Sequence, residues 1–161
     1  MNIINIKDVM TTNPSYCVPG DPSTRAARIM KDKNVGIVPI IESDVDRKLI
    51  GVVTDRDLCL AVVAQNVQPD TVKVQQCMTT LIVAVRPDDD VQKAMTLMSE
   101  NQVRRIPVVN QEGMLEGMVA TADILQRANV SSDETYDVFK KVSEPTDQAS
   151  KPRAKMTQKA T

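Results

Sequence analysis

The stretch MTTNPSYCVPGDPSTRAARIMKDKNVGIVPII at residues 10–41 returns, altered, as MTTLIVAVRPDDDVQKAMTLMSENQVRRIPVV at residues 78–109. Nine residues are identical in the two copies at a constant shift of 68 positions. They are Met10/Met78, Thr11/Thr79, Thr12/Thr80, Pro19/Pro87, Asp21/Asp89, Ala26/Ala94, Met30/Met98, Val35/Val103 and Pro39/Pro107. A constant period of this kind indicates an internal structural duplication.

Beyond these copies the pattern continues after a small change of register. The shift becomes 66 positions, and the identical pairs are Leu49/Leu115, Gly51/Gly117, Val53/Val119 and Asp57/Asp123. The change falls where residues 42–48 face residues 110–114, and both segments are polar and turn-like. Since neither copy is large enough to form a good core alone, we expect the two copies to pack on each other.

The composition describes a small globular protein with an aliphatic core. The 161 residues are 42% hydrophobic, whereas aromatic residues make up only 2%. The formal net charge of −1 gives no global field that attracts nucleic acid or an anionic membrane. Apolar runs fall far short of the roughly 20 residues that span a bilayer, and the opening MNIINIKDVM lacks the apolar region of a signal peptide. We therefore expect a cytoplasmic protein without nucleic-acid or membrane partners.

The chain contains no histidine, which excludes the commonest general base and the usual zinc ligand. The same absence removes Ser-His and Cys-His nucleophile arrangements. The three cysteines, Cys17, Cys59 and Cys77, show no CxxC spacing. We therefore expect them to be buried as small hydrophobic side chains in a protein of a reducing compartment. The sequence thus predicts neither catalytic residues nor a metal site.

Each copy is expected to fold as strand–helix–strand–strand–helix. Asp21 and Pro22 have the residue types of a helix N-cap and of the first helical position. Pro39 lacks a backbone donor, which places its strand at a sheet edge or at a bulge. The expected elements of the first copy are a helix from Asp21 to Asn34, strands at 35–41 and 49–53, and a helix at 55–65; those of the second copy are a helix at 91–100, strands at 103–109 and 115–119, and a helix from 122.

Beyond residue 128 the repeat pattern stops. Residues 129–142 are expected to form a short helix with Tyr136, Phe139 and Val142 at helical spacing. This helix either patches the protein's own surface or makes a dimer contact. Residues 143–161 are polar and contain two prolines, so we expect a disordered tail.

The segment GVVTDRDL at residues 51–58 contains the polar residues that point to a binding function. The spacing of Thr54 and Asp57 matches a capping box, in which a hydroxyl and a carboxylate satisfy free N–H groups at a helix start. A functional interpretation uses the same groups, because a helix start is an anion site and a carboxylate there can accept both ribose hydroxyls of a nucleotide. Gly51 would then let a planar base approach the strand backbone closely.

The duplicated unit, the MTT segments, the strands VGIVPII and VRRIPVV and the segment GVVTDRDL, in this order, resemble the cystathionine-β-synthase (CBS) domain family. The chain looks like a stand-alone tandem CBS pair, or Bateman module, with repeats at residues 4–65 and 74–128 joined by a linker at residues 66–73. The resemblance implies a mixed α/β fold of two β-α-β-β-α repeats. In that family the repeats pack through their sheets with pseudo-twofold symmetry and leave two clefts.

The resemblance also implies a function. CBS pairs commonly bind AMP, ADP or ATP in their clefts, sometimes S-adenosylmethionine or NAD, and usually regulate another protein without catalysis. We therefore expect a regulatory module that binds an adenine nucleotide non-covalently, forms a homodimer and signals to an effector protein in trans. Two alternatives stay open: a ligand-free interaction or dimerisation protein whose clefts are only seams between repeats, and a sensor of S-adenosylmethionine or NAD.

The family pattern Gly-h-h-Thr-x-x-Asp falls on Gly51, Thr54 and Asp57. The resemblance implies that each cleft combines this motif of one repeat with the early and middle strands of the other. The arginines at 104 and 105 suit a phosphate, unless they form surface ion pairs with residues 88–90. The first set of candidate nucleotide-binding residues is Thr54, Arg56, Asp57, Val83, Ala84, Val85, Val103, Arg104, Arg105 and Ile106.

The second set is poorer in polar groups. Ala120 stands at the hydroxyl position, Thr121 comes one residue late, and the facing wall carries no cation. We expect this site to be empty or to hold an adenosine moiety at best, so Asp57 should matter more for nucleotide affinity than Asp123. The members of the second set are Tyr16, Cys17, Val35, Gly36, Ile37, Val38, Met118, Ala120, Thr121 and Asp123.

Overall fold

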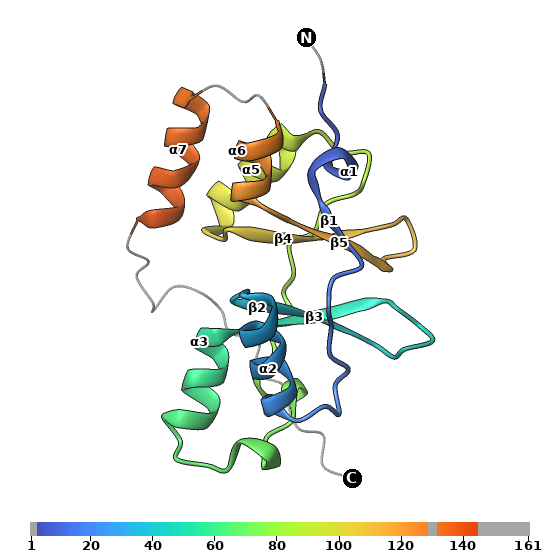
Figure 1. The fold of residues 1–161 in the computed structure, drawn as a ribbon, viewed down its shortest axis with the longest axis vertical. Coiled ribbons are helices and arrows are strands. Elements are labelled where there is room, and N and C mark those ends of the chain that lie inside the picture. The colour runs from blue at the N-terminus through green and yellow to red at the C-terminus, as the bar shows by residue number, and fades with distance from the viewer. Residues whose placement is uncertain (1–2, 129–131, 145–161) are drawn as a thin grey trace. The chain divides into compact units, whose positions relative to one another are not determined.

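The computed structural model describes residues 3–128 and 132–144 and divides the chain into two compact units, each with its own helices and sheet (Figure 1). Unit 2 comprises Ser15–Ile82. Its elements are α2 (Ser23–Lys33), β2 (Ile37–Ile41), β3 (Leu49–Thr54), α3 (Asp55–Leu58), the π-helical turn η1 (Cys59–Val63), the 3₁₀ turn η2 (Pro69–Thr71) and α4 (Val74–Cys77).

Unit 1 combines the N-terminal segment, up to Pro14, with the described residues from Val83 to Glu144. Its elements are α1 (Ile6–Val9), β1 (Thr11–Thr12), α5 (Val91–Asn101), β4 (Arg105–Val109), β5 (Leu115–Ala120), α6 (Thr121–Arg127) and α7 (Ser132–Ser143). The mixed helix and sheet content confirms the predicted fold class. Within the described residues, no helix is both long and apolar enough to cross a membrane.

The predicted hairpins and long helices are present in both copies, but other predictions are wrong. β2 and β4 begin two residues later than predicted, and the predicted helix at 55–65 is α-helical only to residue 58 and then π-helical. The leading strand predicted for the second repeat is reduced to isolated bridges in the described structure.

α2 ends at Asn34, which takes the left-handed conformation with a φ of 52°, and Gln102 ends α5 in the same way. The prediction that Asp21 caps α2 is wrong by one residue, because Pro22 is the N-cap. The Asp21 carboxylate instead accepts the Val18 N–H at 2.9 Å and pairs with Arg25 at 3.2 Å.

Both sheets are built on the same antiparallel hairpin. β2 pairs with β3 in unit 2 and β4 with β5 in unit 1, and the register shifts at Ile40/Ile41 and at Val108/Val109. Pro39 lies beside this irregularity, and no bond to the neighbouring segment needs its missing N–H, because Cys17 donates to the Pro39 carbonyl at 3.0 Å and accepts from the Ile41 N–H at 3.0 Å. In unit 1 Val85 makes the equivalent bonds: it donates to the Pro107 carbonyl at 3.0 Å and accepts from the Val109 N–H at 2.9 Å. The predicted edge or bulge position is thus confirmed.

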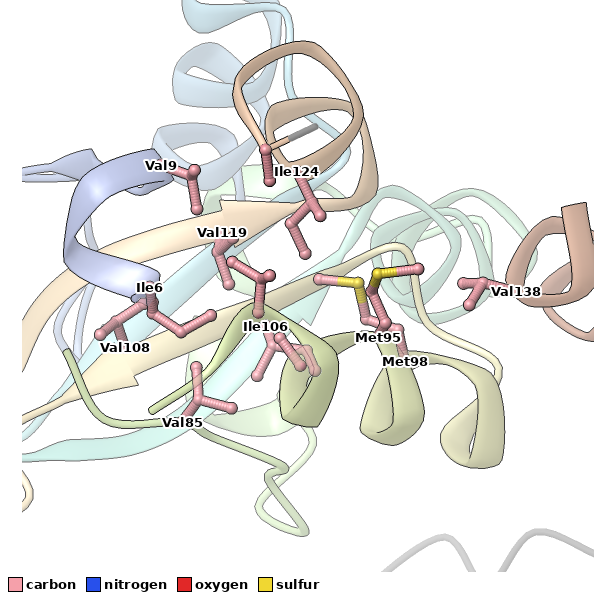
Figure 2. Close-up of a cluster of buried hydrophobic side chains, with 13 residues drawn as sticks. Ile6, Val9, Val85, Met95, Met98, Ile106, Val108, Val119, Ile124 and Val138 are labelled. Carbon is pink, nitrogen blue, oxygen red and sulfur yellow. The ribbon is translucent and has the colours of Figure 1, made fainter. Parts of the chain in front are cut away.

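Each unit has a core of aliphatic and sulfur-containing side chains. Figure 2 shows the core of unit 1, where Ile106, Val119 and Ile124 lie with Met95 and Met98 of α5. Unit 2 buries Val38, Ile40 and Val53 of its hairpin against α2. Among the described residues no aromatic side chain is buried, as the composition predicts.

The compact units do not coincide with the sequence repeats, because the repeats exchange their first segments. α1 precedes the first repeat's hairpin in the sequence, yet Ile6 and Val9 lie in the core of unit 1 with residues of the second repeat. α4 is the equivalent segment of the second repeat at a shift of 68 positions, and Val74 lies in the core of unit 2. Each MTT segment belongs to the same unit as the helix before it: residues 10–12 lie in unit 1 with α1, and residues 78–80 lie in unit 2 with α4.

The exchanged segments explain the two glycines of the central strands. The Thr11 carbonyl lies 2.8 Å from the position that a Cβ on Gly117 would take, and the Thr79 carbonyl lies 3.1 Å from that position on Gly51. The sulfurs of Met10 and Met78 are equally close, at 2.8 and 2.9 Å. The interpretation that Gly51 leaves room for a planar base is therefore wrong, since the space is filled by the protein's own chain.

The C-terminal helix α7 packs on α5 of its own unit (Figures 1 and 2). Its buried residue is Val138, at 8% exposure, and Val142 packs beside it. Tyr136 and Phe139 are 67% and 40% exposed, so they do not form the covering face that their spacing predicts. The predicted tail lies outside the described residues from 145 onward.

Replacing Gly117 with Ala is expected to lower the free energy of unfolding by about 1–3 kcal/mol, because the new Cβ overlaps a backbone carbonyl that cannot move alone. Gly51→Ala should cost less, since its nearest backbone atom is farther away. Gly20→Ala is the control, because nothing lies within 4 Å of its Cβ position. Urea unfolding measures all three; equal stability of the Gly117 and Gly20 variants would contradict the placement of the MTT segment.

Candidate functional site

The GVVTDRDL segment forms the predicted capping box where β3 passes into α3. The Asp57 N–H donates to Thr54 Oγ1 at 3.1 Å, and the Thr54 N–H donates to Asp57 Oδ2 at 2.9 Å. Both residues are half-buried. The structural role of Thr54 and Asp57 is therefore confirmed, and the capping box uses only one oxygen of the carboxylate, Oδ2.

The equivalent turn between β5 and α6 keeps only half of this arrangement. The Ala120 N–H donates to Asp123 Oδ2 at 2.9 Å, but Ala120 has no hydroxyl to return the bond. Thr121 does not replace it, because its hydroxyl is buried and lies 3.2 Å from the Arg104 carbonyl and 3.3 Å from Met98 Sδ. Thr121 thus stabilises the packing inside unit 1 and does not complete the capping box.

In both units the first strand of the hairpin begins beside this helix start. The Asp55 N–H donates to the Gly36 carbonyl at 3.0 Å, and the Thr121 N–H donates to the Arg104 carbonyl at 2.9 Å. Strand pairing sets Ile37 opposite Thr54 and Arg105 opposite Ala120. We call residues 36–37 with 54–57 the unit 2 edge, and residues 104–105 with 120–123 the unit 1 edge.

The unit 1 edge carries two cations, which the sequence analysis groups with Thr54 and Asp57. Arg104 and Arg105 belong to the same edge as Ala120 and Asp123, with Arg104 exposed and Arg105 half-buried. Their predicted ion pairs with residues 88–90 are not formed in the described part of the chain. Asp88 pairs instead with Lys7 at 2.7 Å, and Asp89 with Lys93 at 2.9 Å.

Several predicted site residues turn their side chains into a core. Cys17 and Val38 are 0% exposed in the core of unit 2, and Val85 and Ile106 are at most 1% exposed in that of unit 1. Only their backbone can therefore line a ligand site, because buried hydrophobic side chains point away from solvent. Partly exposed residues of the two sets are Val35, Ile37, Val83, Ala84, Val103 and Met118; Arg56 and Gly36 are exposed.

Tyr16 is engaged by the loop between β2 and β3. Its hydroxyl donates to Asp44 Oδ1 at 2.9 Å, and the guanidinium of Arg47 lies 5.0 Å from the ring centroid. The hydrogen bond to Asp44 raises the pKa of Tyr16, so the phenol stays protonated. The structure thus gives Tyr16 a place in a surface cluster of unit 2.

The cysteines are only partly the buried hydrophobes that the sequence predicts. Cys17 is buried, Cys77 is half-buried and Cys59 is exposed, and all three are free thiols. Burial, and then the charge of Asp57, raise the pKa of the Cys77 thiol to about 11. Cys77 is therefore protonated at neutral pH, and no group of three metal-ligating side chains occurs among the described residues.

Two stretches of the chain, residues 6–64 and 74–129, match the family model of the CBS domain. The chain belongs to the CBS domain family. One similar relative is the uncharacterized protein YlbB of Bacillus subtilis, 40% identical over 119 residues, which are 74% of this chain and 78% of the relative. The match of both stretches confirms the family that the sequence pattern predicts.

Two solved structures of CBS proteins resemble this chain and carry ligands. The CBS domain pair of protein MJ0100, in complex with 5'-methylthioadenosine and S-adenosyl-L-methionine, has a TM-score of 0.68 and 26% identity, covering 78% of this chain and 95% of that chain. CBSX2 in complex with AMP has a TM-score of 0.64 and 28% identity, covering 77% and 95%. Related CBS pairs therefore bind adenosine derivatives.

Thr54→Ala is expected to destabilise unit 2 by about 1 kcal/mol, because it removes the acceptor for the Asp57 N–H. Ala120→Ser should stabilise unit 1 by a similar or smaller amount, because it completes the box with Asp123. Thermal unfolding of the two variants measures this opposite effect. A shift of the same sign in both would contradict the capping role of position 54 and its equivalent.

Proposed function

We propose that this CBS pair is a non-catalytic regulatory module that binds AMP, ADP or ATP and passes the bound state to an effector protein in trans. The observation that carries the proposal is the unit 1 edge, where two arginines lie beside a helix start. The AMP complex of the related CBSX2 supports an adenine nucleotide as the ligand class. The absence of histidine from the chain supports a binding role over catalysis.

The unit 1 edge has the chemistry of a phosphate site. A guanidinium presents several N–H donors in a plane and forms charge-assisted, often paired hydrogen bonds with phosphate oxygens. The bond from the Thr121 N–H to the Arg104 carbonyl holds the arginine backbone against the start of α6. Because Asp123 uses Oδ2 for the Ala120 N–H, its second oxygen is available for a ribose hydroxyl.

We keep Arg104 and Arg105 as the residues that hold the phosphates. The resemblance combines Arg104 and Arg105 with Thr54 and Asp57, whereas the hydrogen bonds of unit 1 join them to Ala120–Asp123. We therefore assign the phosphate end of the nucleotide to the unit 1 edge. Thr54 and Asp57 keep the proposed role of hydroxyl acceptors at the unit 2 edge, where Arg56 is also exposed.

Arg104→Ala should lower ATP affinity about tenfold to a hundredfold in calorimetric titration, because one charge-assisted contact contributes about 1.5–3 kcal/mol. Arg104 is exposed, so the fold should persist. Arg28→Ala, which removes an exposed arginine of α2, is the charge-matched control. Wild-type protein that binds none of AMP, ATP, S-adenosylmethionine and NAD at millimolar concentration would refute the ligand-binding function.

The second candidate is an interaction protein without a ligand, and the exposed aromatics of α7 favour it. Tyr136 and Phe139 are spaced by three residues, and both are exposed although the chain has few aromatics. Aromatic side chains are enriched at protein interfaces. On this account they take part in the expected homodimer.

Sedimentation at micromolar concentration should show a dimer near twice 17.7 kDa. The double variant Tyr136→Ala/Phe139→Ala should shift it toward monomer, because it removes apolar contact area. Val63→Ala, also an exposed apolar residue, is the control in unit 2. A wild-type monomer would contradict the homodimer, and an unchanged dimer in the double variant would remove α7 from its interface.

A further inference from the structure

A groove of about 240 Å³ lies between helices α5 and α7 of unit 1. Its apolar lining is Met95 of α5 and Val138 of α7, and Val138 points toward Met95 in Figure 2. Gln102, at the end of α5, donates from Nε2 to the carbonyls of Lys141 and Glu144 at 3.4 and 3.5 Å, which joins the ends of the two helices. None of the residues that line the groove belongs to the unit 1 edge.

Ser99 is a buried polar residue that lines this groove, one helical turn after Met95. It is only 8% exposed. Its hydroxyl has no hydrogen-bond partner among the described residues. Because a buried hydroxyl without a partner is costly, such a group usually bonds to a molecule from outside the chain. The groove gives such a molecule access to the Ser99 hydroxyl.

Three charged side chains also line the groove: Glu100 of α5, and Asp137 and Lys141 of α7. In the described part of the chain none of them forms a salt bridge. The two carboxylates suit an ammonium group, and the lysine suits a carboxylate. Since the three charges sum to −1, the groove disfavours a polyphosphate and favours a ligand that carries both signs of charge.

The groove is a feature of unit 1 that the duplicated pattern does not require. At the shift of 68 positions, Met95 and Ser99 correspond to Ala27 and Lys31 of α2. Both α2 residues are exposed. The helix surface that α7 covers in unit 1 is therefore open in unit 2.

We propose that the groove between α5 and α7 binds a free amino acid with an apolar side chain. Glu100 and Asp137 attract its ammonium group, Lys141 attracts its carboxylate, and the Ser99 hydroxyl gains a hydrogen-bond partner. The volume of about 240 Å³ is below the roughly 300–1,000 Å³ of most ligand pockets, which suits so small a molecule. This site is additional to the proposed nucleotide site.

The test is an amide NMR titration of the full chain with three probes that share one apolar body. They are L-leucine, 3-methylbutylamine, which lacks the carboxylate, and 4-methylpentanoate, which lacks the ammonium group. We expect millimolar leucine to shift the amides around Ser99 and Val138. Each analogue should bind about twofold to fivefold more weakly, because it loses its contact with exposed charges.

Two variants and a matched control assign the contacts. Lys141→Gln should weaken leucine binding about twofold to fivefold and leave 3-methylbutylamine unchanged, since only leucine carries a carboxylate. Lys140→Gln is the control, because Lys140 is an exposed neighbour on α7 that does not line the groove. Ser99→Ala should weaken leucine binding about threefold to tenfold, and the helix should persist because alanine favours it.

The outcomes separate this inference from the proposed function. A groove that holds only water gives no leucine-dependent shift, and that result overturns the inference. Equal affinity for the three probes, or equal leucine affinity of the Lys141 and Lys140 variants, also overturns it, because the groove then recognises apolar shape alone. Leucine binding that survives in Arg104→Ala supports a separate site, and a failure of ATP to bind refutes only the proposed function.

Discussion

The close approach of a backbone carbonyl to a glycine of the central strand is the contact on which each unit depends. Thr11 makes this approach to Gly117 in unit 1, and Thr79 makes it to Gly51 in unit 2. The strand bonds between Thr79 and Val52, at 2.8 and 3.0 Å, show the same segment joined to its sheet. Any side chain at either glycine would push the MTT segment off the strand. The glycine and the closely packed MTT segment therefore occur together in both copies.

This contact also explains why the N-terminal segment and the second repeat share a core. The segment brings α1 with it, and Ile6 and Val9 are then buried in unit 1. The equivalent α4 buries Val74 in the core of unit 2. The linker residues before α4 are held on α2 by hydrogen bonds from Ser23 Oγ to the Pro69 carbonyl and from the Thr24 hydroxyl to the Asp70 carboxylate, both at 2.6 Å. The linker is thus an ordered part of unit 2.

Because backbone bonds fix the two edges, their side chains are free to differ without altering the fold. The bond between Asp55 and Gly36 and the bond between Thr121 and Arg104 need no particular side chain. Duplication therefore supplies two equivalent positions, and substitution gives them opposite charge. The proposed phosphate binding at the unit 1 edge follows from two arginines on this common backbone.

The sequence predicted the repeat, the hairpins, the end of α2 at Asn34 and the capping box, because each depends on local spacing or on one residue type. Asn34 and Thr54 are examples, since their roles follow from conformation and from reach along the chain. The partner of Gly51, the neighbours of Arg104 and the buried face of α7 were not predictable. They depend on which segments pair across long sequence separations, and spacing within one segment carries no information on that pairing.

The most direct test of the account is a two-dimensional amide NMR titration of ¹⁵N-labelled protein with ATP. The account predicts that the largest shifts fall on Arg104, Arg105 and the start of α6, where the phosphates bind. Smaller shifts, or none, are expected at the start of α3 beside Asp55. Dominant shifts at Asp55–Asp57, or shifts of equal size at both edges, would contradict the assignment of the phosphates to unit 1.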